Sequence, residues 1–177
     1  VPMDNGLKVY QALMSAGADL GIQNAGYRAI ESLRLEKGYR AWGADLSPDH
    51  TPLEAGLGWA VKLKSDTDFL GKGALQQQRR DGLKKLMACF TVQDPKINLI
   101  GRETLYRNGK RVGWLTSAGY GHTLDCNIGY GYVRNTSGVD HDFLKNGEYT
   151  LEVAGIQVPC EIHLKPLYDP TMARIRA

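Results

Sequence analysis

The most constraining feature of the sequence is a change of hydrophobic period at Gly82. Before this glycine the apolar residues recur at helical spacing, whereas after it they alternate with polar residues over short runs, as in half-buried strands. Tight hairpin turns are predicted at Asn108-Gly109 and Ala154-Gly155. The pattern predicts an α+β chain in which a helical part, residues 1–82, precedes a small six-stranded antiparallel β-barrel, residues 83–177. The six predicted strands are 83–92, 103–107, 110–116, 127–133, 148–153 and 156–165.

The part before Gly82 shows three helical patterns and one short alternating run. Asp4 is predicted to cap a first helix that packs into a core through Leu7, Tyr10, Leu13 and Met14. A second, amphipathic helix runs from about Tyr27 to Lys37 and is ended by Gly38. The run Trp59 to Leu63 reads as a strand, and a third helix follows from about residue 68 and ends at Asp81-Gly82.

A short loop between two helix ends is the candidate for rigid presentation of side chains. It carries Tyr39, Arg40 and Trp42, and it lies between Gly38 and the turn Ser47-Pro48-Asp49. Behind it, Thr51-Pro52-Leu53-Glu54 has the pattern of a capping box, in which Thr51 and Glu54 bond to each other's backbone N–H.

Composition excludes several classes of protein. A net charge of +3 over 177 residues is too small to indicate nucleic-acid binding, and no apolar run reaches the roughly 20 residues of a membrane span. The three cysteines are widely spaced and have no histidine at ligand spacing, so neither a disulfide framework nor a metal site is predicted. The chain begins at Val1 without an initiator Met, which suggests a fragment of a longer polypeptide.

The glycine and histidine patterns argue against nucleotide binding and nucleophilic catalysis within this chain. Gly119/Gly121 and Gly129/Gly131 are G-x-G pairs within predicted strands, and each lacks the third glycine of a dinucleotide fingerprint. The four histidines lie in separate segments, and no G-x-S-x-G elbow is present. His163 is predicted to be a packed or edge residue of a strand.

Four stretches carry a resemblance to a known family: SLRLEKGYRAWGADLSPDHTPLEAGLGWAVKL, FLGKGAL, NGKRVGWLTSAGY and HLKPLYDP. The chain resembles the carboxy-terminal half of the aminomethyltransferase (glycine-cleavage T-protein) superfamily, and within it the folate-binding tail of sarcosine and dimethylglycine dehydrogenases. The resemblance implies that residues 1–82 are the C-terminal part of a folate-binding domain and that residues 83–177 are the family's C-terminal barrel.

The resemblance also implies a set of folate-binding residues, with no catalytic residue in this chain. Tyr39 matches a tyrosine of the folate pocket, Glu36 and Arg40 flank it, and Arg174 takes a family ligand position near the carboxy terminus. Spacing alone would leave Glu36 and Arg40 as an exposed ion pair. The arginine that T-proteins use against folate is replaced here by Ile30, and the family's folate-binding glutamate and its aspartate for methylene transfer would lie upstream of Val1.

The activity implied is that of the folate-binding module of a flavin-dependent dehydrogenase. Its upstream part would bind FAD and oxidise a small N-methyl amine, sarcosine or dimethylglycine, and tetrahydrofolate would accept the carbon as 5,10-methylenetetrahydrofolate. Two alternatives remain open: a stand-alone T-protein of glycine cleavage, and a non-catalytic regulatory relative that serves protein interaction. The expected location is the cytoplasm of a bacterium or the mitochondrial matrix of a eukaryote.

The basic run Arg79 to Lys85 has two interpretations. It is either a solvated face or a patch that attracts the polyglutamyl tail of folate.

Overall fold

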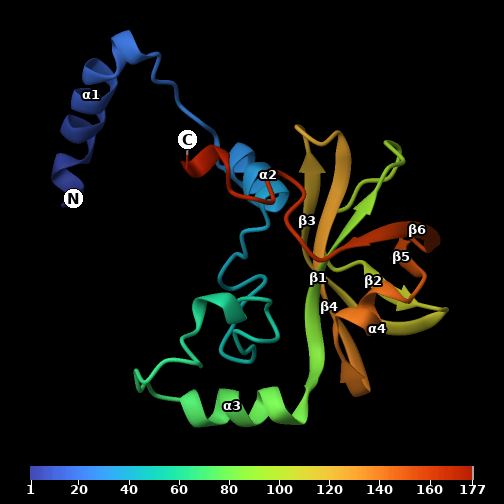
Figure 1. Ribbon diagram of the computed structural model, residues 1–177. Coiled ribbons are helices and arrows are strands. Elements are labelled where there is room, and N and C mark those ends of the chain that lie inside the picture. Colours follow the sequence, from blue (N-terminus) through green and yellow to red (C-terminus); the bar gives the residue numbers. More distant parts are fainter. Residues whose placement is uncertain (177) are drawn as a thin grey trace. The chain divides into compact units, whose positions relative to one another are not determined.

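The computed structural model describes residues 1–176 and divides the chain into two compact units, Val1–Ile30 and the residues from Glu31 onward (Figure 1). The second unit holds a closed β-barrel together with the helices and turns that pack on it. None of the helices in the described residues combines the length and the apolar character needed to cross a bilayer.

The first unit contains one α-helix, α1 (Gly6–Ala16), between the 3-10 turns η1 (Met3–Asn5) and η2 (Ala18–Leu20). Two predictions fail in this unit. Asp4 lies inside η1, and the N-cap of α1 is Asn5, which makes no side-chain capping bond. The apolar stripe of α1 does not form a core within this unit, because Leu7, Tyr10 and Leu13 stay 47–67% exposed and Met14 is only partly buried. Thirty residues provide too little apolar surface to form a second layer over the helix.

Helix α2 (Tyr27–Lys37) has the predicted bounds and ends at Gly38 in a Schellman motif. Gly38 takes a φ of 75°, a left-handed conformation that strains other residues. Its N–H donates to Leu35 O (3.2 Å), and the N–H of Tyr39 donates to Arg34 O (2.9 Å). The glycine therefore turns the chain sharply immediately before Tyr39.

The strand predicted at Trp59 to Leu63 is wrong, since the segment forms the 3-10 turn η3 (Gly58–Ala60) and a further bend. Its backbone bonds are local, from Ala60 N to Leu57 O and from Leu63 N to Val61 O. A strand needs a neighbouring strand to bond with, and in the described residues the barrel uses its strands for its own closure. The third predicted helix is present as α3 (Lys72–Asp81); it ends as predicted but begins about four residues later than expected.

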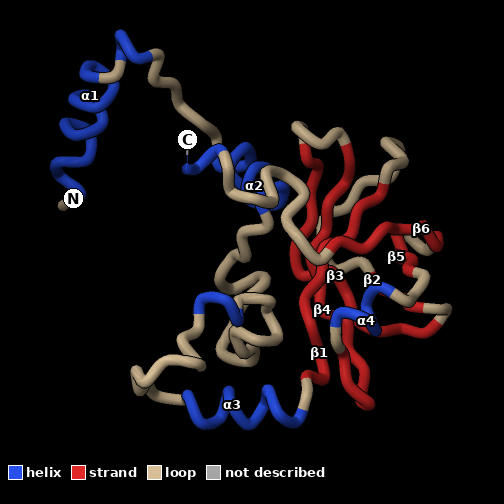
Figure 2. The backbone as a smooth tube through the Cα atoms, viewed as in Figure 1, coloured by secondary structure: helices blue, strands red, loops and turns tan. Residues whose placement is uncertain are grey.

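The barrel is confirmed as six antiparallel strands in the closed order β1-β4-β3-β2-β5-β6 (Figure 2). Pairing of β1 with β6, for example Phe90 with Ile162, closes it. The predicted turns form, with φ values of 49° and 73° at Asn108-Gly109 and of 49° and 80° at Ala154-Gly155, as in type I′ turns. The strands are β1 (Leu83–Val92), β2 (Thr104–Arg107), β3 (Lys110–Gly121), β4 (Cys126–Val139), β5 (Tyr149–Val153) and β6 (Ile156–His163).

Sequence reasoning placed the ends of β3 and β4 too early and missed a short helix, α4 (His141–Lys145). Both strands continue through small and polar residues that carry no strand signal of their own, and they are held by pairing such as Gly119 with Ile128. Helix α4 is capped by Asp140, whose carboxylate accepts from the N–H of Phe143 (2.7 Å). One turn is too short to show a helical period.

Strand β1 is buried on both faces and separates two apolar clusters. Leu86, Ala88 and Phe90 point into the barrel, whereas Met87 and Cys89 point outward under α2. Leu35 of α2 is 2% exposed and packs into the outer cluster. Burying such a leucine contributes about 1.5–3 kcal/mol, which fixes α2 against the outer wall of the barrel.

Secondary structure changes from helix to strand at Gly82, whose φ is 81°, so the sequence locates this transition correctly. The compact units, however, divide at Ile30. The assignment of residues 1–82 and 83–177 to two domains thus stays a prediction.

Candidate functional site

The Tyr39 loop, residues 38–46, leaves α2 and presents two exposed aromatic side chains. Tyr39 is 48% exposed and Trp42 is 74% exposed. The loop closes on itself through a bond from Gly43 N to Leu46 O (2.7 Å) and through a parallel bridge between Trp42 and Leu46. A tight loop that holds aromatic rings toward solvent can contact a flat heteroaromatic ligand at low entropic cost.

Arg40 anchors the start of this loop. Its Nε donates to Ala55 O (3.2 Å), its Nη1 donates to Gly38 O, and its guanidinium lies 5.9 Å from the centre of the Tyr130 ring. Because its recorded partners are carbonyl oxygens and a ring, Arg40 ties the loop to the 51–57 turn and to the barrel.

Glu36 is separated from Tyr39 and Arg40, against the cluster that the sequence predicts. Its side chain is 2% exposed, and its Oε1 accepts a 2.6 Å bond from the backbone N–H of Thr123. A Cβ on Gly121 would come within 3.2 Å of the same carboxylate oxygen. The left-handed turn at Gly38 sends Tyr39 outward while Glu36 stays on the face of α2 that covers the barrel. The exposed Glu36–Arg40 ion pair is therefore also wrong.

The Tyr168 segment, residues 166–174, brings Arg174 to the C-terminal end of α2. The N–H of Tyr168 donates to Glu36 O (3.0 Å), and Lys37 forms a 2.8 Å ion pair with Asp169. Arg174 is exposed, and its Nη1 donates to the Tyr168 hydroxyl (2.7 Å). The structure thus brings Arg174 near the end of α2 from which Tyr39 and Arg40 leave, whereas the side chain of Glu36 faces the barrel. The roles of all four residues stay predictions.

The pKa of Asp169 is lowered, chiefly by the hydrogen bond from Lys37. Asp169 also accepts from the N–H groups of Ala173 (2.8 Å) and Arg174 (3.3 Å). An ionised Asp169 therefore holds both the Tyr168 segment and the backbone of Arg174 in place.

The polar network beneath the Tyr39 loop was missed by sequence reasoning. Asp45 is 0% exposed and lies between Arg34, Thr116 and Ser117, and its carbonyl accepts from the Tyr132 hydroxyl (2.9 Å). Asp45 stands between Ala44 and Leu46 in a short loop, where an aspartate is ordinarily exposed, so its local pattern gives no signal of burial. Only the fold of the strands brings its donors together.

Two histidines of this unit, His50 and His163, make contacts within the fold, as the sequence predicts for His163. In β6, its Nε2 lies 2.8 Å from Thr91 Oγ1. His50 stacks on Tyr132 with ring centres 4.4 Å apart, and burial, aided by Lys85, lowers the pKa of His50. A neutral, stacked imidazole fits a structural role at this position.

The G-x-G pairs are packing glycines of β3 and β4. A Cβ on Gly129 would come 2.4 Å from Leu115 Cδ1, and one on Gly131 would come 2.5 Å from the Trp114 carbonyl oxygen. Both glycines let strands approach closely rather than cradle a phosphate. FAD therefore does not fit these glycines.

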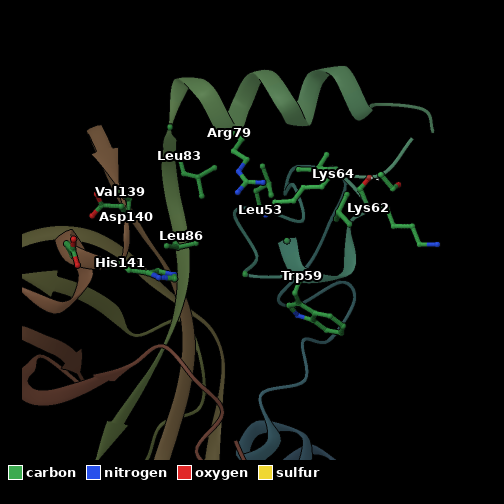
Figure 3. A pocket seen from close by; sticks show the side chains of 17 residues that line it. Leu53, Trp59, Lys62, Lys64, Arg79, Leu83, Leu86, Val139, Asp140 and His141 are labelled. Carbon is green, nitrogen blue, oxygen red and sulfur yellow. Dashed lines mark hydrogen bonds between the residues drawn. The ribbon is translucent and has the colours of Figure 1, made fainter. Parts of the chain in front are cut away.

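A cavity of about 1070 Å³ lies apart from the four predicted site residues (Figure 3). Figure 3 shows Arg79 extending from α3 between Leu53 and Leu83, above the apolar wall that includes Leu86. The residues predicted as a strand, among them Trp59, form the opposite wall.

The basic run Arg79 to Lys85 does not form one continuous surface. Arg79 lines the cavity, whereas Lys85 donates to Asp49 O (2.8 Å) and lies 3.5 Å from Glu54. The polyglutamyl-tail reading of this run stays a prediction.

Two family models match the chain in order. The GCVT N-terminal domain matches residues 1–65, and the glycine cleavage T-protein C-terminal barrel domain matches residues 84–169. A solved structure, the glycine cleavage system aminomethyltransferase T from Bartonella henselae, superposes with a TM-score of 0.77 and 26% identity. That match covers 96% of this chain and 45% of the aminomethyltransferase.

Longer relatives share more identity with the chain. It is 48% identical to the mitochondrial sarcosine dehydrogenase of Mus musculus, over 99% of this chain and 19% of the relative. It is 40% identical to the mitochondrial pyruvate dehydrogenase phosphatase regulatory subunit of Mus musculus (94% and 20%) and 36% identical to the mitochondrial dimethylglycine dehydrogenase of Homo sapiens (98% and 20%). The chain spans about a fifth of the length of these relatives. With both domain families matched in order and the barrel observed, the chain belongs to the aminomethyltransferase (glycine cleavage T-protein) superfamily, within which it is similar to a segment of sarcosine and dimethylglycine dehydrogenases.

Proposed function

We propose that the chain is the folate-binding module of an FAD-dependent sarcosine or dimethylglycine dehydrogenase. The observation that carries the proposal is the 48% identity with a sarcosine dehydrogenase across 99% of this chain, compared with 43% identity across 74% of this chain for an aminomethyltransferase. FAD and the N-methyl amine would be held by other parts of such a polypeptide. The mitochondrial names of the relatives support the mitochondrial matrix in a eukaryote, and the cytoplasm is the corresponding place in a bacterium.

The residues at the end of α2 suit tetrahydrofolate. Tyr39 offers an accessible ring for the pterin face, and its hydroxyl is free to bond at the pterin edge. Arg174, exposed beside Tyr168, offers a cation to a folate carboxylate. Glu36 and Arg40 support these contacts from behind, since Glu36 O holds Tyr168 and Arg40 anchors the Tyr39 loop.

Holding folate at this position would direct the fate of the oxidised carbon. An iminium formed from an N-methyl amine loses its carbon to water as formaldehyde. When bound, tetrahydrofolate supplies the amine nitrogens that take up this carbon as 5,10-methylenetetrahydrofolate. The chain contributes by fixing the pterin and limiting access of water, which makes capture effectively intramolecular.

A second candidate is a non-catalytic regulatory role, which the 40% identity to the phosphatase regulatory subunit favours. A stand-alone aminomethyltransferase is the third reading, supported by the Bartonella henselae structure. Folate binding discriminates against the regulator, and dependence on an amine-oxidising flavin distinguishes the dehydrogenase from the aminomethyltransferase.

The test is titration of the chain with tetrahydrofolate in an anaerobic calorimeter, with variants of Tyr39. Tyr39→Phe keeps the ring and loses at most a hydrogen bond, about 0.5–1.5 kcal/mol. Tyr39→Ala also loses the face contact and should weaken binding roughly 30- to 150-fold. In the intact dehydrogenase the alanine variant should raise formaldehyde release while amine oxidation stays unchanged.

Tyr27→Ala is the matched control, since Tyr27 is another exposed tyrosine (74%) of α2. It should bind folate like the wild type. Equal affinity in wild type, Tyr39→Phe and Tyr39→Ala would show that Tyr39 lies outside the pocket. Lack of folate binding by the wild type would favour the regulatory role.

A further inference from the structure

The carboxylate of Asp45 is the centre of the buried network beneath the Tyr39 loop. The side chain is 0% exposed, and its two oxygens accept four hydrogen bonds from three separate segments. The donors are Arg34 Nη1 (2.7 Å) in α2, the Ala41 N–H (3.0 Å) in the loop, and Thr116 Oγ1 (2.5 Å) and Ser117 Oγ (2.7 Å) in β3. A carboxylate removed from water to this degree is stable only with such a complete set of donors.

Arg34 links this hydrogen-bond network to the backbone of Tyr39. Its guanidinium is held by Asp45, by Glu31 (2.9 Å) and by Ser117 Oγ (3.1 Å), and its Nη1 also lies 3.4 Å from the carbonyl oxygen of Tyr39. The N–H of Tyr39 in turn donates to Arg34 O (2.9 Å). Both backbone polar groups of Tyr39 thus contact the same arginine.

The Tyr39 side chain itself makes none of these bonds and is 48% exposed. A fixed backbone with an accessible ring is the arrangement expected of a preorganised contact, because the loop is ordered before a ligand arrives. A network that served stability alone would need no link to the residue that offers its side chain to solvent.

We propose that Asp45 and Arg34 are positioning residues for Tyr39, fixing its backbone so that the ring meets the pterin without reordering of the loop. The inference rests on the proposed folate-binding function. It assigns to these two charged residues a role in binding that acts through the backbone of Tyr39. Their contribution to affinity passes through Tyr39 and disappears when the Tyr39 side chain is removed.

Asp45→Asn is the variant that tests this. It keeps the shape of the side chain but replaces one acceptor oxygen with an amide donor, which leaves a buried N–H donor unpaired or facing the Arg34 guanidinium. Tetrahydrofolate affinity should fall about 10-fold, the cost of ordering a loop and its side chain on binding. In the Tyr39→Ala background the same substitution should change affinity less than about 2-fold.

Glu103→Gln is the matched control. Glu103 is also a buried carboxylate (8% exposed), and its Oε1 accepts from the N–H of Ile100 (2.8 Å), away from the Tyr39 loop. It should lower the melting temperature but leave folate affinity at the wild-type value. Amide exchange gives a readout without ligand: Asp45→Asn should speed exchange at Ala41, and Glu103→Gln should not.

The outcomes separate this proposal from the proposed function. If the wild type binds no folate, the proposed function fails. If the wild type binds folate and Asp45→Asn binds it equally well, the positioning role is overturned. It is also overturned if Asp45→Asn lowers folate affinity by the same factor in the Tyr39→Ala background as in the wild type. Should Asp45→Asn fail to fold, Arg34→Lys replaces it, because a lysine keeps the charge but lacks the guanidinium fork that joins Asp45 to Tyr39 O.

Discussion

At the scale of single residues, buried carboxylates decide how the segments before the barrel attach to it. Asp45, Glu36 and Glu54 are 0%, 2% and 8% exposed, and each accepts hydrogen bonds from backbone or side-chain donors. Glu54 accepts from the N–H of Thr51 (2.9 Å) and from Gln78 Nε2 (3.2 Å). Removing any one donor leaves a buried charge less well solvated, which is costly in a site of low dielectric constant.

The reciprocal bonds of the predicted capping box are present, although the segment makes one turn rather than a helix. The N–H of Glu54 donates to Thr51 Oγ1 (3.3 Å), and Thr51 N donates to Glu54 Oε2. Thr51→Ala should therefore lower the free energy of unfolding by about 1 kcal/mol, measured by urea denaturation. Thr51→Ser keeps the hydroxyl and should retain most of the stability. An unchanged midpoint and slope for Thr51→Ala would mean that the bond contributes nothing.

At the scale of elements, α2 is the part on which the site depends. Its buried face packs on β1 through Leu35, its end turns at Gly38 into the Tyr39 loop, and Glu36 O accepts from Tyr168. The hydroxyl of Tyr130 in β4 also donates to Leu35 O (3.0 Å), the same carbonyl oxygen that accepts from the Gly38 N–H (3.2 Å). One helix end thus aligns the loop, the barrel wall and the Tyr168 segment.

The ion pair between Lys37 and Asp169 predicts a pH dependence for this junction. The folded pKa of Asp169 lies below its ordinary value of 3.8, so its contribution to stability is complete above about pH 4 and is lost as pH falls through the folded pKa. The difference in melting temperature between wild type and Asp169→Asn should be constant from pH 5 to 7 and should shrink below about pH 4. A difference that grows on acidification would contradict this assignment.

At the scale of the whole molecule, the barrel is the body of the second unit, and the end of α2 and the Tyr168 segment attach to its outer wall. Its interior cluster and the outer cluster under α2 share β1, so that one strand contributes to both cores. The match to the Bartonella henselae aminomethyltransferase covers 45% of that protein, and the match to sarcosine dehydrogenase covers 19% of that relative. The chain therefore corresponds to a limited part of the machinery in both relatives.

We predict that the 177-residue chain alone shows no sarcosine oxidation and no methylene transfer above background. The glycine pairs pack strands together instead of forming a flavin-binding loop, and His50 and His163 stack or bond within the fold. The measurement is turnover of sarcosine with tetrahydrofolate and an electron acceptor, followed as formaldehyde and as methylenetetrahydrofolate. Turnover by the purified chain would refute the prediction, and folate binding without turnover would agree with it.

Much of the fold follows from local pattern, and much of the site does not. The bounds of α2, the strand β1 and both type I′ turns follow from period and turn chemistry. The predicted strand at 59–63 fails because alternation shows only that a strand is possible, and pairing requires a neighbour. Helix α1 has an apolar stripe, yet within residues 1–30 its side chains remain exposed.

The sequence by itself determined the family, the strands and hairpin turns from which the barrel is built, and the placement of Tyr39 after a helix-ending glycine. The strands, turns and helix end each depend on residues close together in the chain. Only the tertiary structure decided that Asp45 is a buried acceptor, since its Ser117 donor lies 72 residues away along the chain. The same holds for Glu36, whose partner Thr123 is 87 residues away. A charged residue has no local signature of burial, because what offsets its desolvation is the set of donors that other segments bring to it.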